Sequence, residues 1–226
     1  AAFRAADLGL KVALIERFST IGGVCLNVGC IPSKALLHMA KVITEAEDAS
    51  HHGIKFNKPE IDLEKIREWK NNDVVGKLTG GLSQMAGQRK VVVIEGYGKF
   101  TGSNSIEIEG KDKKRTKVNF NSAIIAVGSK PIVIPNTPDH PNIIDSTGAL
   151  EFKDIPERML IVGGGIIGLE MGTVYDALGS KITVVELADG LIQGCDRDLV
   201  RPLQKRMEKR FENIHLNTKV IQIKAD

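Results

Sequence analysis

The pattern of apolar and polar positions repeats at two places in the chain. Residues 6–16 and residues 176–186 each contain a helix end, a glycine, a lysine, an apolar run and a terminal glutamate, at an offset of 170 residues. A helix followed in this way by a buried strand is typical of one half of a βαβ unit. The repeat therefore predicts an α/β fold with two related units.

The second unit has the full sequence pattern of a nucleotide-binding βαβ unit. An apolar strand is expected at residues 158–162, a glycine-rich stretch follows at 163–168, and a helix is expected from about 166 to 178. Glu186 closes the next strand, 23 residues after Gly163. A G-x-G-x-x-G stretch in this context is typical of a dinucleotide-binding site.

Each part of this fingerprint has a physical role. Gly163 makes the tight turn, Gly165 lets the backbone approach a pyrophosphate, and Gly168 lets the helix pack closely on the strand. The helix N-terminus favours the phosphate charge. Glu186 accepts hydrogen bonds from a ribose diol and would repel a 2′-phosphate, so the pattern predicts NAD rather than NADP. The predicted NAD-binding residues are Gly163, Gly165, Ile166, Ile167, Gly168 and Glu186.

The first unit is expected to be incomplete. If the repeat holds, the counterpart of Gly168 falls at the third residue before Ala1, so the first strand and its glycine loop are expected upstream. Residues 218–223 have the pattern of a strand, and a second nucleotide-binding domain would not be complete there. We therefore expect a fragment of a longer protein, with a first domain at residues 1–145 and a second, also incomplete, at 146–226.

The region between the two repeats has a mixed pattern. Helical periodicity covers residues 35–50 and 61–87, although polar residues at 71–73 weaken the second helix. The other expected elements are strands of a β-meander near 91–95, 105–109 and 116–120, a buried strand at 123–127, and a linker stiffened by Pro131, Pro135, Pro138 and Pro141. Together these elements predict two Rossmann-like units with a small β-meander.

Two cysteines lie in a glycine-bounded segment before the first long helix. Cys25 and Cys30 are separated by four residues, and on an undistorted helix their side chains would point about 140° apart. Because a disulfide needs Cα atoms within roughly 7 Å, the backbone must bend between linked cysteines, and Gly29 permits that bend. The segment therefore predicts a pair of thiols that can open and close as a redox disulfide.

Composition and charge exclude several classes of protein. The chain is 42% hydrophobic and 26% charged with a net charge of +3, which is too small to favour nucleic acid binding. No apolar stretch approaches 18 residues, and no signal peptide is visible. Zinc normally takes four ligands and no second cysteine pair is present, so no metal site is expected and the lone Cys195 is expected to be inert. Three cysteines favour redox chemistry in a reducing compartment over a secreted disulfide scaffold.

The cysteine segment, residues 22–37, is similar to the active-site disulfide segment of the flavin disulfide reductases, the class I pyridine nucleotide-disulfide oxidoreductases. The Cys-x4-Cys motif is highly specific for that family. Further stretches that occur in the family's order are Glu16-Arg17, residues 78–82, residues 96–100, residues 126–129 and residues 163–172. The resemblance covers essentially the whole chain, as the first half of such an enzyme.

The resemblance implies FAD on the first unit and NAD on the second. Cys25 would exchange with the substrate sulfur, and Cys30 would lie against the flavin. Lys34 matches the family's lysine near the flavin, and Glu170 matches the ion-pair partner of that lysine. The implied catalytic residues are Cys25, Cys30, Lys34 and Glu170. The implied FAD-binding residues are Glu16, Arg17, Gly22, Gly23, Cys25, Lys34, Gly98, Ala126, Val127 and Gly128.

Within that family the chain most resembles the bacterial dihydrolipoamide dehydrogenases. This likeness implies oxidation of protein-bound dihydrolipoamide with reduction of NAD, a lipoyl domain of a 2-oxoacid dehydrogenase complex as partner, a homodimer and a cytoplasmic location. The family's catalytic histidine belongs to a C-terminal domain, so His38 is not assigned that role. Little lipoamide turnover is expected from the 226 residues alone.

Two other enzyme types and one class without activity stay open. Glutathione reductases prefer NADP, usually with arginines near the end of the second nucleotide-binding strand, whereas Glu186 is followed here by Leu187 and Ala188. Mercuric reductases need a further C-terminal cysteine pair, about which this sequence says nothing. A surface or structural protein that keeps the fold without catalysis is the alternative of a different class.

Overall fold

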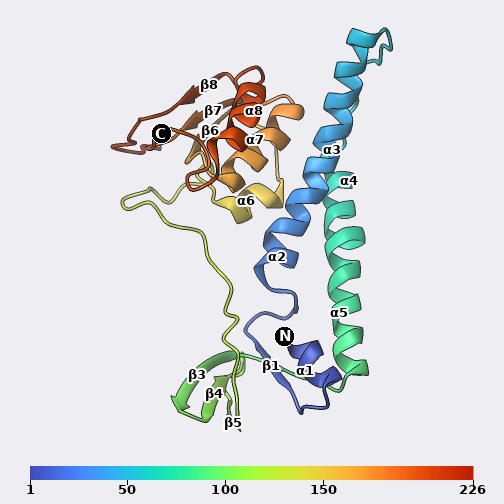
Figure 1. The fold of residues 1–226 in the computed structure, drawn as a ribbon, viewed down its shortest axis with the longest axis vertical. Helices are drawn as coiled ribbons and strands as arrows, with labels where there is room; N and C mark the ends of the chain where they lie inside the picture. The colour runs from blue at the N-terminus through green and yellow to red at the C-terminus, as the bar shows by residue number, and fades with distance from the viewer. Residues whose placement is uncertain (226) are drawn as a thin grey trace. The chain divides into compact units, whose positions relative to one another are not determined.

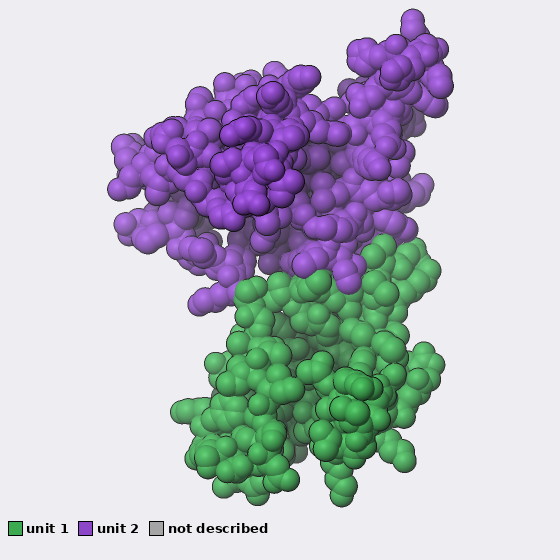
Figure 2. Space-filling view, in the orientation of Figure 1, with its two compact units in different colours: residues 1–27, 72–129 green, residues 28–71, 130–226 purple. Residues whose placement is uncertain are grey.

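The computed structural model describes residues 1–225, which form two compact units that we describe separately (Figure 2). Unit 1 comprises residues 1–27 and 72–129, and unit 2 comprises residues 28–71 together with the chain from residue 130 onward. Each unit has its own cluster of buried apolar side chains. The predicted domain boundary at residue 145 stays a prediction.

Unit 1 contains a parallel pair of strands and an antiparallel meander. Its elements are α1 (Ala2–Asp7), β1 (Ala13–Glu16), α5 (Lys77–Gln88), β2 (Val92–Glu95), β3 (Tyr97–Gly102), β4 (Ser105–Glu109) and β5 (Arg115–Asn119). β1 pairs in parallel with β2, from Ala13 opposite Val92 to Glu16 opposite Glu95. The buried side chains of Ile21, Ala86 and Val91 pack with apolar residues of α1 and β1.

The meander differs from the prediction in its first strand. Its order is β3-β4-β5, whereas the predicted first strand near 91–95 is β2 and pairs with β1. The sequence of β3 contains Gly98 and Gly102 and all its residues are exposed, so it carries no alternating apolar signal. Gly98 lies close to neighbouring side chains, because a Cβ there would approach Ile106 Cδ1 to 2.9 Å and Ile15 Cγ2 to 3.3 Å.

The predicted buried strand at residues 123–127 is wrong. These residues have no regular structure and are exposed, with Val127 at 86%. An apolar β-branched run forms a strand only when a neighbouring strand supplies hydrogen bonds, and β1 and β2 form a sheet of two strands only. The run therefore has the composition of a buried strand without a sheet in the described chain to accept it.

Unit 2 is built on a parallel sheet of the order β6-β7-β8 (Figure 1). Its elements are α3 (Cys30–Ala49), η1 (Ser50–His52), α4 (Leu63–Glu68), α6 (Ser146–Glu151), β6 (Arg158–Val162), α7 (Ile166–Ala177), β7 (Lys181–Val185), α8 (Arg197–Met207) and β8 (Asn213–His215). The predicted strand and helix of the glycine fingerprint are confirmed as β6 and α7. α3 packs against α7, and Leu36 and Ala40 join the main core through this contact.

The predicted helix at residues 61–87 is helical but not continuous α-helix. Asp62 caps α4 by accepting a hydrogen bond from the Lys65 N–H at 3.1 Å, and η2 (Trp69–Gly76) is a π-helix that separates α4 from α5. The π-helix includes the polar residues at 71–73 that weaken the sequence pattern. Lys70 within it is buried and donates to the Leu150 carbonyl at 2.7 Å. The irregular turn therefore lets a buried lysine reach the end of α6.

The predicted strand at residues 218–223 is also wrong. After β8 the chain forms a loop that bonds to the residues following β7. The Asn217 N–H donates to the Ala188 carbonyl at 2.8 Å, and the Thr218 N–H donates to the Glu186 carbonyl at 2.9 Å. The residues that follow have no strand beside them, and Ile221 is exposed. As at residues 123–127, apolar alternation alone does not make a strand.

Candidate redox and nucleotide-binding site

The cysteine segment spans two helices separated by a break. α2 (Gly23–Val28) carries Cys25, and α3 begins at Cys30, with Gly29 between them at φ −145° and ψ −120°. The backbone therefore bends where the sequence predicts a bend. Both cysteines are exposed. Their link as a disulfide stays a prediction.

The first turn of α3 makes polar contacts with α7. Lys34 Nζ forms an ion pair with Glu170 Oε1, and the Ser33 hydroxyl donates to Glu170 Oε2 at 2.5 Å. The side chain of Glu170 is 18% exposed and that of Lys34 is 62% exposed. The structure thus brings together Lys34 and Glu170, which sequence analysis paired, and adds Ser33. Lys34 lies one helical turn after Cys30 on α3.

The glycine fingerprint adopts the backbone that its residue types allow. Gly163 has φ +107°, which disfavours any side chain. Gly165 caps α7 with nothing within 4 Å of a Cβ placed on it, so the space beside it is open. A Cβ on Gly168 would approach the Gly163 carbonyl oxygen to 2.7 Å. The helix N-terminus carries no side-chain cap, which suits an anionic pyrophosphate.

Glu186 is held directly beside the fingerprint. Its Oε2 accepts a hydrogen bond from the Gly164 N–H at 2.6 Å, and its Oε1 accepts one from the Ala188 N–H at 2.8 Å. Each carboxylate oxygen has a second lone pair for a ribose hydroxyl. The geometry therefore presents a fixed, negatively charged acceptor at the end of β7.

The residues assigned to FAD in unit 1 include Glu16 and Arg17 at the end of β1 and three glycines with positive φ. Glu16 ends β1 and accepts a hydrogen bond from the Phe18 N–H at 3.1 Å, and the Arg17 guanidinium stacks on the Phe18 ring at 4.6 Å.

Gly22 has φ +120°, and a Cβ there would meet Leu26 Cδ2 at 2.5 Å. Gly128 has φ +73° and lies next to Val24, whose Cγ2 is 3.4 Å from a Cβ placed on Gly128. The turn at 126–128 thus lies beside the start of α2. Gly23 has φ +64°, and Ala126 and Val127 are exposed.

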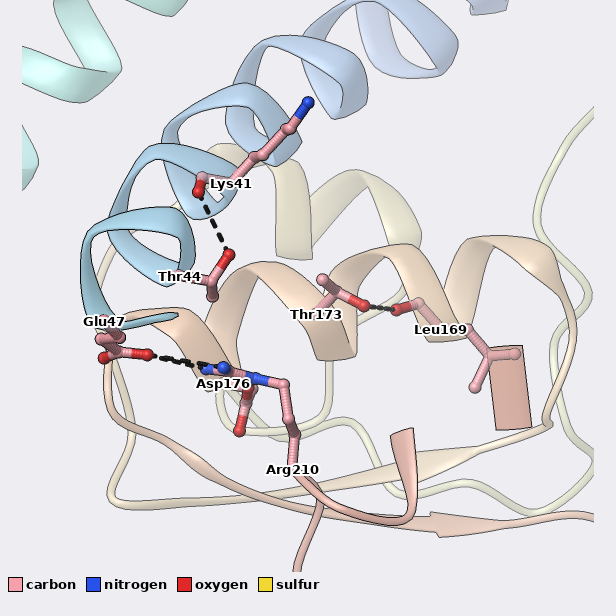
Figure 3. A network of polar contacts seen from close by, with 7 residues as sticks. All are labelled: Lys41, Thr44, Glu47, Leu169, Thr173, Asp176 and Arg210. Atoms are coloured by element: carbon pink, nitrogen blue, oxygen red, sulfur yellow. Dashed lines mark hydrogen bonds and ion pairs between the residues drawn. The ribbon is translucent and has the colours of Figure 1, made fainter. Parts of the chain in front are cut away.

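A second polar network joins α3 and α7 farther along both helices (Figure 3). Arg210 Nε donates to Asp176 Oδ2 at 2.5 Å, and its terminal nitrogens reach Glu47 Oε2 at 3.4 and 3.5 Å. Burial raises the pKa of Asp176, and the hydrogen bond from Arg210 partly offsets this effect. The pKa of Arg210 is raised by the two carboxylates against the opposing effect of burial. The network therefore depends on the pairing of charges that are partly withdrawn from water.

Comparison with known proteins identifies the family. The sequence profile of the pyridine nucleotide-disulphide oxidoreductases matches residues 1–226.

The chain belongs to the pyridine nucleotide-disulphide oxidoreductase family. Curated relatives in this family are named dihydrolipoyl dehydrogenase. Identity is 58% over 226 residues with the Vibrio parahaemolyticus protein, 54% over 226 residues with that of Haemophilus influenzae, and 40% over 225 residues with the mitochondrial protein of Dictyostelium discoideum. These alignments cover 100%, 100% and 99% of this chain but 47%, 47% and 46% of the relatives. The chain therefore spans about half the length of the curated relatives it matches.

Solved structures give the same fold. The HOCl-induced flavoprotein disulfide reductase RclA of Escherichia coli aligns with a TM-score of 0.80 at 28% identity, over 97% of this chain and 46% of its own. LpdA of Mycobacterium tuberculosis aligns with a TM-score of 0.85 at 21% identity, over 98% of this chain and 48% of its own, which is a likeness of fold. The predicted family and the predicted fold with Rossmann-like units are confirmed.

Two residues of this oxidoreductase escaped sequence analysis. Ser33 was not singled out, because a serine in the first turn of a helix is common and its partner is 137 positions away. Gly164 occupies a variable position of the fingerprint, yet a Cβ on it would approach Leu191 Cδ2 to 2.5 Å and Glu186 Cβ to 3.2 Å. The run of three consecutive glycines at 163–165 was the only sequence signal for that close approach.

Two other kinds of site are absent from the part of the chain that the structure describes. Within residues 1–225, the His, Cys, Asp and Glu side chains form no group of three or more that could hold a metal ion. None of the helices described has the length and apolar character needed to cross a membrane.

Proposed function

We propose that a full-length protein carrying this chain is a dihydrolipoamide dehydrogenase. It oxidises protein-bound dihydrolipoamide to lipoamide and reduces NAD. The observation that carries the proposal is the contact of Lys34 and Ser33 with Glu170, which joins the helix beginning at Cys30 to the helix of the nucleotide fingerprint. The name of the curated relatives supports the substrate.

The sulfur chemistry that we propose is a thiol–disulfide exchange. A thiolate of dihydrolipoamide attacks Cys25 Sγ, the bond to Cys30 breaks, and Cys30 leaves as a thiolate. The second substrate thiol loses its proton and attacks the resulting mixed disulfide, which releases lipoamide and returns Cys25 to the thiol state. The substrate dithiol loses two electrons, which the cysteine pair gains, and two protons, of which one passes to Cys25 and the other to solvent when the attacking thiolate forms. Lys34 stabilises the Cys30 thiolate, and Glu170 orients Lys34.

The residues fit both cofactors. Gly165 leaves open space at the uncapped N-terminus of α7, and Glu186 presents carboxylate oxygens, so these residues would hold the pyrophosphate and ribose of NAD. Glu16 at the end of β1, and Gly22 and Gly128 at their turns, would hold FAD, together with Arg17, Gly23, Cys25, Lys34, Gly98, Ala126 and Val127. When bound, FAD accepts the electron pair of the dithiol and supplies hydride to NAD.

The remaining proposals concern the assembly of the whole protein. The partner is the lipoyl domain of a 2-oxoacid dehydrogenase complex, and the enzyme is a cytoplasmic homodimer. The FAD-binding domain contains residues 1–145 and the NAD-binding domain begins at residue 146. Gel filtration of the full-length protein combined with light scattering tests the dimer, and a monomer at micromolar concentration would contradict it.

Steady-state kinetics with competing substrates test the activity. We expect turnover with dihydrolipoamide and NAD, and at least tenfold lower kcat/KM with NADP because Glu186 repels a 2′-phosphate. Oxidised glutathione and Hg²⁺ are assayed with reduced nucleotides in parallel. Preference for either of these would replace the proposal by the corresponding reductase, and no turnover with any of them would favour the non-catalytic alternative.

Serine substitutions test the roles of the sulfurs. Cys30→Ser removes the thiolate and should abolish the long-wavelength absorbance that a thiolate gives beside a flavin, whereas Cys25→Ser should retain it. Both variants should lose at least 1,000-fold in kcat, because the exchange needs both sulfurs. Cys195→Ser is the matched control and should keep normal turnover. Unchanged spectra in both Cys25→Ser and Cys30→Ser would contradict the assignment.

A further inference from the structure

The hydroxyl contact of Ser33 with Glu170 differs from the contacts that the two threonine hydroxyls of the same helices make. Thr44 on α3 donates to the Lys41 carbonyl at 3.1 Å, and Thr173 on α7 donates to the Leu169 carbonyl at 2.8 Å (Figure 3). Such bonds back to the preceding turn are the usual choice of a hydroxyl within a helix. Ser33 instead donates to a carboxylate on the other helix, at 2.5 Å. Its proton is therefore committed to Glu170.

Glu170 receives one donor on each carboxylate oxygen. Ser33 bonds Oε2 and Lys34 pairs with Oε1. The two donors differ in mobility, because the side chain of Lys34 is 62% exposed while Ser33 is only 4% exposed. A long exposed lysine has many rotamers, and the last torsion of a glutamate has a broad energy minimum. The short, buried serine is thus the donor that fixes the orientation of the carboxylate.

The surroundings of Ser33 hold it in one place. Pro32 before it is buried, as are Ala35 and Leu36 after it, and the Ser33 N–H donates to the Gly29 carbonyl at 3.1 Å. The hydroxyl therefore projects from a packed helical turn that begins at Cys30. A hydrogen bond from this turn to α7 ties the position of Glu170 to the position of Cys30.

We propose that Ser33 is a positioning residue for the redox reaction. It orients Glu170, which in turn directs the Lys34 ammonium group toward the start of α3. This inference rests on the proposed function. It adds to the ion pair a neutral donor without which the lysine is not held in a productive orientation.

Substitutions in the full-length enzyme test the proposal. Ser33→Ala removes only the hydroxyl and should lower kcat with dihydrolipoamide about tenfold, while KM for NAD changes by less than twofold. Ser33→Thr keeps the hydroxyl and should recover most of the loss. Thr44→Val removes a buried hydroxyl of the same helix that bonds only within its own turn, and it should leave kcat unchanged.

A double-mutant cycle with Glu170→Ala separates positioning from simple packing. If Ser33 acts through Glu170, Ser33→Ala should lower kcat about tenfold in the parent and by less than twofold in the Glu170→Ala background. An equal loss in both backgrounds would overturn the inference, as would a normal kcat for Ser33→Ala. Thermal unfolding of the four proteins is recorded alongside, and coupling seen in the melting temperature but not in kcat would also overturn it.

Failure of the proposed function gives a different result. A parent protein that binds FAD but does not turn over dihydrolipoamide would contradict that function, and the role of Ser33 in the reaction would fall with it. A parent that turns over dihydrolipoamide, combined with a Ser33→Ala variant of normal kcat, would contradict the positioning role alone.

Discussion

The backbone N–H of Gly164 links the glycine fingerprint to Glu186. Its N–H holds Glu186 at 2.6 Å, and Leu191 fills the space where a side chain would project. Gly164→Ala must displace Leu191 or Glu186, so we expect a loss of about 1–3 kcal/mol in the free energy of unfolding and a rise of about tenfold in the Kd for NAD. Urea denaturation and isothermal titration with NAD measure the two effects.

Gly165→Ala provides the matched control for that substitution. A Cβ on Gly165 meets nothing within 4 Å, so stability should change by less than about 0.5 kcal/mol. NAD binding should still weaken, because the added methyl group occupies the approach to the pyrophosphate. Equal losses of stability in the two alanine variants would contradict the different roles assigned to adjacent glycines.

Sequence analysis identified residues with a recognisable motif, but it missed residues whose contacts are made by distant parts of the chain. It paired Lys34 with Glu170 from the family resemblance and selected Gly163, Gly165, Gly168 and Glu186 from their spacing. Ser33 and Gly164 were missed since their roles depend on residues distant in the sequence. Only the packing of α3 on α7, and of the loop at Leu191 on the fingerprint, reveals them.

Arg210 provides a second polar link between α3 and α7, because it contacts Glu47 and Asp176. Arg210→Ala would leave Asp176 with its side chain only 11% exposed and without its guanidinium partner. We expect a loss of about 2–3 kcal/mol in the free energy of unfolding, measured by urea denaturation at pH 7. Arg201→Ala, on the exposed part of α8, is the control and should change stability by less than about 0.5 kcal/mol. A similar effect of both substitutions would show that the network contributes nothing specific.

Elements were predictable from sequence where the periodicity was strong and the partners were near in the chain. β6 and α7 follow their patterns closely, and the long helix after Cys30 was expected. The strands predicted at 123–127 and 218–223 do not form, because an apolar alternation signals a need for burial but not which strand provides it. β3 was missed for the opposite reason, since its glycines and exposed residues lack the alternation.

The pH dependence of stability reflects burial in the main core of unit 2. Tyr175 is 2% exposed and donates its hydroxyl proton to the Ala149 carbonyl at 2.9 Å, and burial raises its pKa to about 12. The folded state therefore holds this proton more tightly than the unfolded state, whose tyrosine pKa is about 10. The resulting stabilisation is complete below pH 10 and is lost as the pH rises through about 12.

Tyr175→Phe tests this dependence. Wild type should exceed the variant in stability by about 1 kcal/mol near neutral pH. The difference should shrink above pH 10 and change sign before pH 12, because a pKa raised to about 12 makes the loss on ionisation larger than this advantage. Lys70, whose pKa is lowered by burial, contributes equally to both proteins and cancels in the difference. Urea denaturation at intervals from pH 8 upward provides the measurement. A difference that stays constant with pH would contradict the titration of a buried phenol.

Across the whole chain, the second repeat has the complete pattern of strand, glycine stretch, helix and acidic residue, whereas the first has only the helix end, the strand and the acidic residue. Unit 2 contains the sheet, helix, glycines and acid of the dinucleotide-binding fingerprint, whereas unit 1 contains β1, Glu16 and Cys25 of α2. The repeat at an offset of 170 residues relates them, and the family match covers both. The two units are the basis of the proposed transfer of electrons from sulfur to a nicotinamide by way of a flavin.

Differential alkylation of the cysteines tests that account most directly. The oxidised full-length protein is treated with an alkylating reagent before and after one equivalent of dihydrolipoamide, and again after addition of NAD, and the peptides are identified by mass spectrometry. We expect Cys25 and Cys30 to be protected, then alkylated, then protected again, while Cys195 behaves the same in all three samples. Equal labelling of Cys25 and Cys30 in every sample would contradict a reversible disulfide at this site.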